Sequence, residues 1–342
     1  MQLSIPPQTT YKIEQLEPFS IYSKYCEKLT KSLIEIDKIF IKKLKLDGPE
    51  LEQYLPGIAR SGLPTSVFYT NYMFLKTLKE ENNLNKSKKI LSEFKLWALK
   101  DKTRKELQIR PLNCLKSIDH DFADDIIKDP PKEGYDVKAH TVEVPEKKEF
   151  QQGKKYVEIA LATLANTPEL NHFHKQVLTY LESIVLFAGV GLTGGTTVKT
   201  MGDIFIRLHT PNLDANHNIG LAWLSRTSYY LEQLVHETSH VHLDLIMEFD
   251  PIILNGSEAD YESPIRNDKR PMRGVFHATY VLYCLKNMYE TLLKQSHCEE
   301  QTKRLDIIEK HLRIGILSVR KDARLTEYGN LFMKYIEKGV EL

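Results

Sequence analysis

The pentad His236-Glu237-Thr238-Ser239-His240 constrains this chain more than any other feature of its sequence. In a helix, which turns by ~100° per residue, two residues four positions apart lie only about 40° apart around the axis. Both imidazoles then face the same side, one turn apart. Because neutral imidazole is a good ligand for zinc and iron, such a pair fixes two coordination positions of one metal ion.

The sequence around the pentad predicts that helix. The stretch from Tyr229 to Phe249 contains no Gly or Pro, and its apolar residues recur at helical spacing: Leu231, Leu234, Val235, Leu245, Ile246 and Phe249. We therefore expect a half-buried helix. A purely structural histidine pair inside it would be costly unless hydrogen-bonded, which favours a metal site over two satisfied core histidines.

The composition favours no nucleic-acid or membrane partner. Lys and Arg number 47 against 46 Asp and Glu, so a net charge of +1 gives no reason to expect binding to nucleic acid or to an anionic membrane. The first twenty residues lack an apolar run and the stretch 184–192 is too short to span a bilayer, so we expect neither secretion nor membrane insertion.

Four scattered cysteines without a C-x-x-C pair favour a reducing cytoplasm. The oligomeric state stays open.

Hydrophobic periodicity predicts a mainly α protein with a small β-sheet, an α+β fold. We expect a helical N-terminal region over 1–128, a linker or hairpin over 129–155 and a metal-binding catalytic region over 156–342. Expected helices span 22–46, 66–81, 88–99, 156–165, 172–187, 275–294, 303–317 and 325–337. Residues 189–202 suit turns and short strands, and 203–208 alternates like a strand. That strand is either an ordinary sheet member or the lip of a cleft, where an extended peptide would pair with it.

A third metal ligand can be sought after the helix. The metzincin extension of the pentad is excluded, because Leu243 and Ile246 stand where it requires Gly and His. A gluzincin would need a Glu on a later helix, whereas Glu258 and Glu262 sit in a polar, loop-like stretch. The better candidate is His277, which lies at the start of the next apolar helix, although a buried structural histidine is the alternative.

Two further features surround these candidates. Asp244 lies about 40° further round the helix than His240, which suits a partner for an imidazole N–H better than a ligand, whereas His242 points to roughly the opposite face. The loop before the next helix holds four basic residues, Arg266, Lys269, Arg270 and Arg273. Such a cluster is either a solvent-exposed basic surface or a binding site for a carboxylate, which an Arg binds bidentately.

The motif residues resemble a known family, the HExxH-type peptide β-hydroxylases that tailor ribosomally made, post-translationally modified peptides. The resemblance covers about 203–288, with a weaker echo at 325–329. Beyond the pentad, it is carried by Tyr261, Arg266, Asp268, Arg270, Pro271, Gly274, His277 and Tyr280. Two positions depart from the family pattern: Ile265 stands in place of Trp, and Ala278 replaces a Gly.

The resemblance implies a zincin-like metal helix and a non-haem Fe(II) oxygenase that consumes 2-oxoglutarate and O₂ to hydroxylate a side-chain β-carbon of a precursor peptide. His236, His240 and His277 would hold the iron, and Arg266 or Arg270 would bind the far carboxylate of 2-oxoglutarate. Three histidines depart from the common 2-His-1-carboxylate triad. Glu237 would then orient a ligand or a bound water.

The same residues leave two alternatives open. In a Zn(II) metallopeptidase, Glu237 would act as the general base on a metal-bound water. The basic residues of the loop over 266–273 would bind a carboxylate of the substrate. In a non-catalytic binding protein, the metal site would be structural and would support no turnover.

Overall fold

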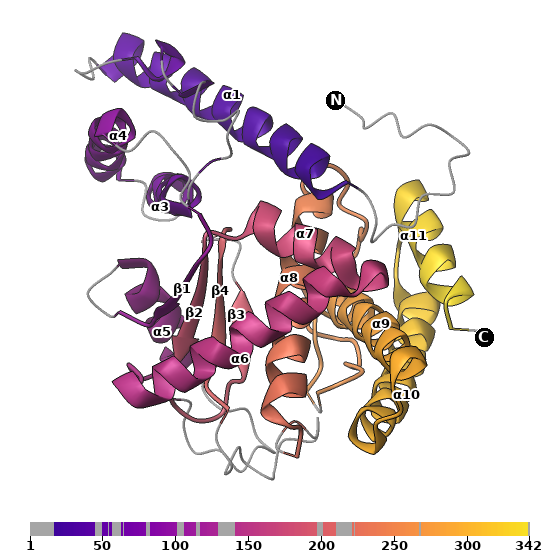
Figure 1. Ribbon diagram of the computed structural model, residues 1–342. Helices are drawn as coiled ribbons and strands as arrows, with labels where there is room; N and C mark the ends of the chain where they lie inside the picture. The colour runs from indigo at the N-terminus through magenta and orange to yellow at the C-terminus, as the bar shows by residue number, and fades with distance from the viewer. Residues whose placement is uncertain are drawn as a thin grey trace.

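A computed structural model describes residues 17–44, 50–53, 55–56, 63, 65–79, 83–100, 106–113, 117–128, 141–196, 201–209, 221, 223–266 and 268–340. The chain is mainly helical and contains one small mixed sheet, as the hydrophobic periodicity predicts. Figure 1 shows the sheet on one side of the molecule, with a long helical layer beside it. No helix among these residues combines the length and the apolar character needed to cross a membrane.

The sheet has four strands in the order β1-β2-β4-β3. Its strands are β1 (Gln108–Pro111), β2 (Ser183–Phe187), β3 (Gly194–Thr196) and β4 (Asp203–Arg207). The strands β1, β2 and β4 run parallel, and β3 pairs antiparallel with β4, with Gly194 opposite Ile206. The strand predicted at 203–208 therefore forms, but it lies between β2 and β3. It cannot be the lip of a cleft, because both of its edges are paired; the sheet edge next to it is β3.

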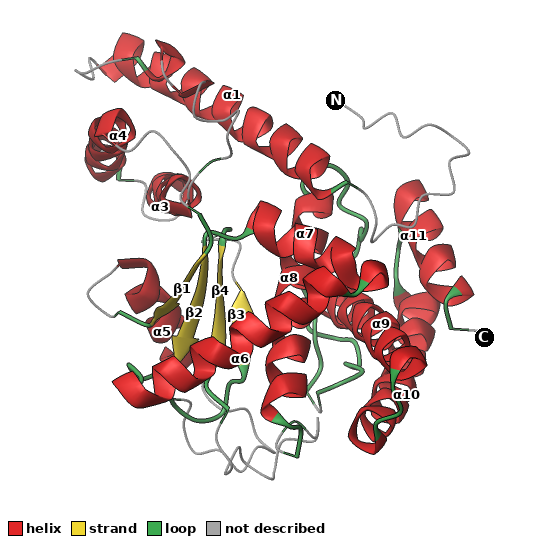
Figure 2. Cartoon of the chain, in the orientation of Figure 1, coloured by secondary structure: helices red, strands yellow, loops and turns green. Residues whose placement is uncertain are grey.

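The helices cover both faces of this sheet (Figure 2). They are α1 (Pro18–Leu44), α3 (Thr65–Lys79), α4 (Leu84–Lys100), α5 (Ser117–Lys128), α6 (Lys147–Asn166), α7 (Asn171–Tyr180), α8 (Arg226–Met247), α9 (Met272–Gln295), α10 (Glu299–Asp322) and α11 (Glu327–Lys338), with short 3-10 turns at Leu51–Gln53 and Pro168–Leu170. On one face, Phe122 of α5 stacks on Phe205 at 3.7 Å between ring centroids. On the other face, α6 and α8 pack together over the sheet.

The residues before 129 share the sheet and the main core with those after 155. The strand β1 pairs with β2, and one cluster of buried apolar residues extends from Tyr22 to Val340. Residues 129–140 of the expected linker lie outside the described residues. The helix α6 begins at Lys147, inside the segment for which we expected a connection, with a capping box between Glu146 and Glu149.

One predicted helix ends earlier than expected. The span 172–187 divides into α7, which ends at Tyr180, and the buried strand β2. The prediction of a continuous helix was wrong because Ile184 to Phe187 is a short apolar run, and such a run fits a strand buried on both faces as well as a helix. The remaining predicted helices are confirmed; most of their ends shift by a few residues, and α6 begins nine residues before the expected start at 156.

Candidate metal centre

The helix α8 carries the first two candidate ligands. It starts at Ser225, whose side chain accepts a hydrogen bond from the Ser228 backbone N–H, and continues without Gly or Pro to Met247. His236 and His240 sit one turn apart on it, with their Nε2 atoms 3.3 Å apart. Two ligands that each lie about 2.0–2.1 Å from a tetrahedral ion are separated by about 3.3 Å, so this spacing suits one shared ion.

The helix α9 brings the third candidate to the same place. Pro271 precedes its first turn, and His277 lies in its second turn. The Nδ1 atom of His277 is 3.2 Å from Nδ1 of His240, and the two rings are within 19° of parallel. The structure therefore brings together all three histidines predicted from the sequence.

The three rings do not yet point at one position. His236 approaches Nε2 of His240, whereas His277 approaches its Nδ1, on the other side of the same ring. In this arrangement no group of three or more His, Cys, Asp or Glu side chains within the described ranges is set to hold an ion. A shared ion would require the His277 ring to turn toward the Nε2 pair.

Asp244 lies beside the third histidine, although His277 Nε2 forms no hydrogen bond with any of the described residues. Its Oδ1 atom lies 3.4 Å from Nε2 of His277 and accepts a hydrogen bond of 2.8 Å from Arg273 Nη2. A carboxylate beside one ring nitrogen favours the tautomer with a proton on that nitrogen. His277 would then carry its proton on Nε2 and offer Nδ1 as the donor atom.

Burial keeps all three imidazoles neutral. It lowers the pKa of His236 to about 4, and it lowers the pKa of His240 well below the ordinary value, with further lowering by electrostatic interaction with His236, His277 and Arg266. Burial also lowers the pKa of His277, against the opposing effect of Asp244. Since a metal binds only the neutral ring, these donors need no deprotonation near pH 7.

Glu237 turns toward the sheet. Its side chain is 3% exposed, and a Cβ atom added at Gly194 of β3 would lie 2.6 Å from Glu237 Oε1. The glycine thus lets the edge strand approach α8 closely. Oε1 also lies 4.0 Å from His236 Nε2, and burial raises the pKa of Glu237 to about 8. The carboxyl group is therefore beside the candidate ligands, on their sheet side.

The two candidate arginines have different surroundings. Arg266 is exposed, and its positive charge contributes to the lowered pKa of both His236 and His240. Arg270 has its Nε 2.8 Å from Asp268 Oδ2, and its backbone bridges to Tyr261 through hydrogen bonds of 2.8 and 3.1 Å. Of these two arginines, Arg266 is the one whose charge lowers the pKa of His236 and His240, whereas Arg270 lies against Asp268 in the loop.

A buried ion pair behind the metal helix was not found from the sequence. Glu232, four residues before His236, accepts hydrogen bonds from Arg304 of α10 and from Tyr289 of α9 at 2.6 to 2.9 Å. Both Glu232 and Arg304 are almost fully buried. This network fixes α8 against α9 and α10. In the sequence, the one indication of this pair was a glutamate, Glu232, at a position of the helix that faces the core. Its partner Arg304 lies 72 residues further along the chain.

The other side chains considered from the sequence lie away from the three rings. His242 is buried, and its Nδ1 lies 2.7 Å from the Tyr180 hydroxyl, so it belongs to the core and not to the candidate metal centre. Glu258 and Glu262 are exposed and lie outside any helix, which gives no support to a gluzincin ligand set. Comparison with protein-family models and with curated protein sequences finds no match for this chain.

Proposed function

We propose that this chain is a non-haem Fe(II) and 2-oxoglutarate-dependent oxygenase that hydroxylates a side-chain β-carbon of a precursor peptide. The contact between His277 and His240 of the HExxH pair carries the proposal, because 36 residues separate the two in the sequence and yet their Nδ1 atoms lie 3.2 Å apart. The resemblance to the HExxH-type peptide β-hydroxylases assigns these same three histidines to the iron.

The imidazole nitrogens of these residues are ligand atoms that suit a ferrous ion. His236 and His240 would bind through Nε2 and His277 through Nδ1, all as neutral imidazoles. The Asp244 carboxylate would accept the Nε2–H of His277 and orient its ring. Completion of the site would require the His277 ring to turn toward the Nε2 atoms of His236 and His240.

When bound, iron supplies with O₂ and 2-oxoglutarate the oxidant that converts a C–H bond to C–OH, with succinate and CO₂ as co-products. In this proposal Arg266 binds the far carboxylate of 2-oxoglutarate, because its charge already acts on His236 and His240. Arg270 has a positioning role through Asp268.

The substrate peptide would pair with the outer edge of β3. Among the described residues this strand has a partner on one side only, β4, and its Gly194 lies against Glu237. An extended peptide added there would run past the metal helix, with main-chain hydrogen bonds for affinity. A metal helix beneath a mixed sheet with an antiparallel edge strand is also what a zincin-like fold would have.

A Zn(II) metallopeptidase is the second candidate, and the position of Glu237 favours it. A carboxyl oxygen 4.0 Å from a ligand nitrogen lies where a general base would contact a metal-bound water. The two candidates differ in the role of that carboxylate. It is essential in hydrolysis and dispensable for oxidation.

The test supplies protein, prepared without oxygen, with Fe(II), 2-oxoglutarate and then O₂, and measures succinate by mass spectrometry. We expect Fe(II)-dependent succinate that Zn(II) does not support, that His277→Ala abolishes and that Glu237→Gln only reduces. Candidate peptides should gain one oxygen atom and stay intact. Peptide cleavage with Zn(II), lost in Glu237→Gln, would establish the peptidase instead, and the absence of both products would leave a binding protein.

A further inference from the structure

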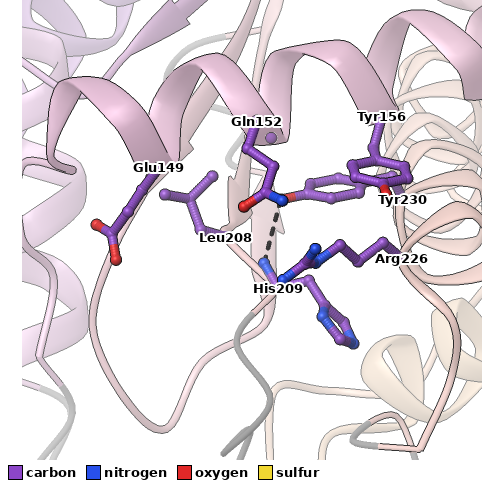
Figure 3. A pocket seen from close by; sticks show the side chains of 8 residues that line it. Glu149, Gln152, Tyr156, Leu208, His209, Arg226 and Tyr230 are labelled. Atoms are coloured by element: carbon purple, nitrogen blue, oxygen red, sulfur yellow. Dashed lines mark hydrogen bonds between the residues drawn. The ribbon is translucent and has the colours of Figure 1, made fainter.

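A pocket of about 100 Å³ lies between α6, the first turns of α8 and the end of β4, and none of His236, His240 and His277 lines it (Figure 3). Glu149, Gln152 and Tyr156 of α6 form one side of it, and Arg226 and Tyr230 of α8 form another. Arg226 is the first residue of α8, so the pocket begins about 15 Å along the helix axis from the metal ligands.

The walls of this pocket are held by contacts within the protein. The Tyr230 hydroxyl accepts a hydrogen bond of 3.1 Å from the His209 backbone N–H, and the Tyr156 and Tyr230 rings lie within 9° of parallel at 6.2 Å. Gly153 permits this packing, because a Cβ there would clash with Leu208 and lie 2.9 Å from the Tyr230 hydroxyl. The pocket is therefore formed before any ligand enters.

The pocket carries one charge of each sign at its two ends. Figure 3 shows Glu149 and Arg226 on opposite sides of it, and no ion pair joins them. Arg226 lies over the Tyr156 ring at 5.9 Å and forms no ion pair with another described residue. One oxygen of Glu149 accepts a hydrogen bond of 3.3 Å from the Glu146 backbone N–H. Both groups could therefore bind a ligand of opposite charge.

The separation of these charges sets the length of a ligand that contacts both. Glu149 and Tyr156 are seven residues apart on α6, about 10 Å along the axis, and Arg226 lies over Tyr156. A ligand that contacts both groups must therefore carry its two charges at opposite ends of a chain. An α-amino acid carries both charges on one carbon, whereas an ω-amino carboxylate separates them.

We propose that this pocket binds an ω-amino carboxylate. The carboxylate would contact Arg226 and the Gln152 amide, the ammonium group would contact Glu149, and the aliphatic chain would lie along Tyr156. Binding here requires no metal, so it stands or fails independently of the oxygenase proposal.

Calorimetric titration of the metal-free full-length protein tests this, with 4-aminobutanoate as the probe and pentanoate, which replaces the ammonium group by a methyl group, as its control. We expect 4-aminobutanoate to bind more tightly than pentanoate. Arg226→Gln should weaken 4-aminobutanoate about tenfold, and Glu149→Gln should remove the preference over pentanoate. Lys155→Gln, which removes an exposed charge from α6 outside the pocket, should leave both affinities unchanged.

Thermal unfolding of each variant would show that it folds, and Arg226→Lys provides a second variant that keeps the charge and should retain part of the affinity. The proposal is overturned if the parent protein shows no saturable heat with 4-aminobutanoate. It is equally overturned if Arg226→Gln binds the probe as the parent does, or if the parent does not distinguish the probe from pentanoate.

Discussion

Replacement of Asp244 by Asn should weaken metal binding without unfolding the protein. The Asp244 carboxylate lies 3.4 Å from His277 Nε2 and is held by Arg273 at 2.8 Å. Asn keeps the shape and removes the charge that favours the Nε2–H tautomer. Loss of such a partner of a metal-bound histidine typically costs 10–100-fold in metal affinity, which corresponds to about 1.4–2.8 kcal/mol.

The assay is a competitive titration of Co(II) or Fe(II) into the anaerobic protein against a chelator of known affinity. Arg273→Gln should have a smaller effect in the same direction, because it only loosens Asp244. Glu248→Gln is the matched control, since this carboxylate also lies at the end of α8 but pairs with Lys28 at the surface. Equal metal affinity for the parent and Asp244→Asn would refute the assigned role of Asp244 and the Nδ1 binding mode of His277.

Three further predictions concern the elements that support the site. Gly194→Val should place its side chain against Glu237 and lower the unfolding free energy by about 1–3 kcal/mol, seen as a lower midpoint in urea. Arg304→Met should cost about 3–5 kcal/mol in the same assay, because it leaves Glu232 buried without its cation. Burial raises the pKa of Glu232, but Arg304 lowers it more, so the net pKa is lowered in the folded state. The stabilisation from the Glu232 carboxylate is fully present above the pKa that Glu232 has in the unfolded chain, and it is lost as the pH falls through the folded-state pKa. The difference in unfolding free energy between the parent protein and Glu232→Gln should therefore shrink from about pH 5 to pH 3.

The elements predicted well are those with long, regular periodicity. The helices α8 and α9 follow directly from apolar spacing and the absence of Gly and Pro, and the pentad fixes which face of α8 carries the ligands. The strand β1 was missed because it has four residues and ends in Pro111. The strand β4 was predicted, but its position between β2 and β3 was not. The pattern of apolar residues had placed β2 inside a predicted helix over 172–187.

The same division holds within the candidate site. Asp244 could be anticipated because it shares a helix face with His240, and His277 because it opens the next helix. The effect of the Arg266 charge on the histidine pair was one of two options, since a loop sequence does not fix which arginine lies nearer to the metal helix. The Glu232–Arg304 pair was invisible, because pairing across 72 residues is decided by how α8 and α10 pack.

Anomalous diffraction at the iron edge, from crystals loaded with Fe(II) without oxygen, tests the central claim most directly. The account predicts one peak about 2.1 Å from Nε2 of His236, Nε2 of His240 and Nδ1 of His277, with 2-oxoglutarate extending from it toward Arg266. A peak that lacks His277, or iron bound elsewhere in the chain, would contradict it.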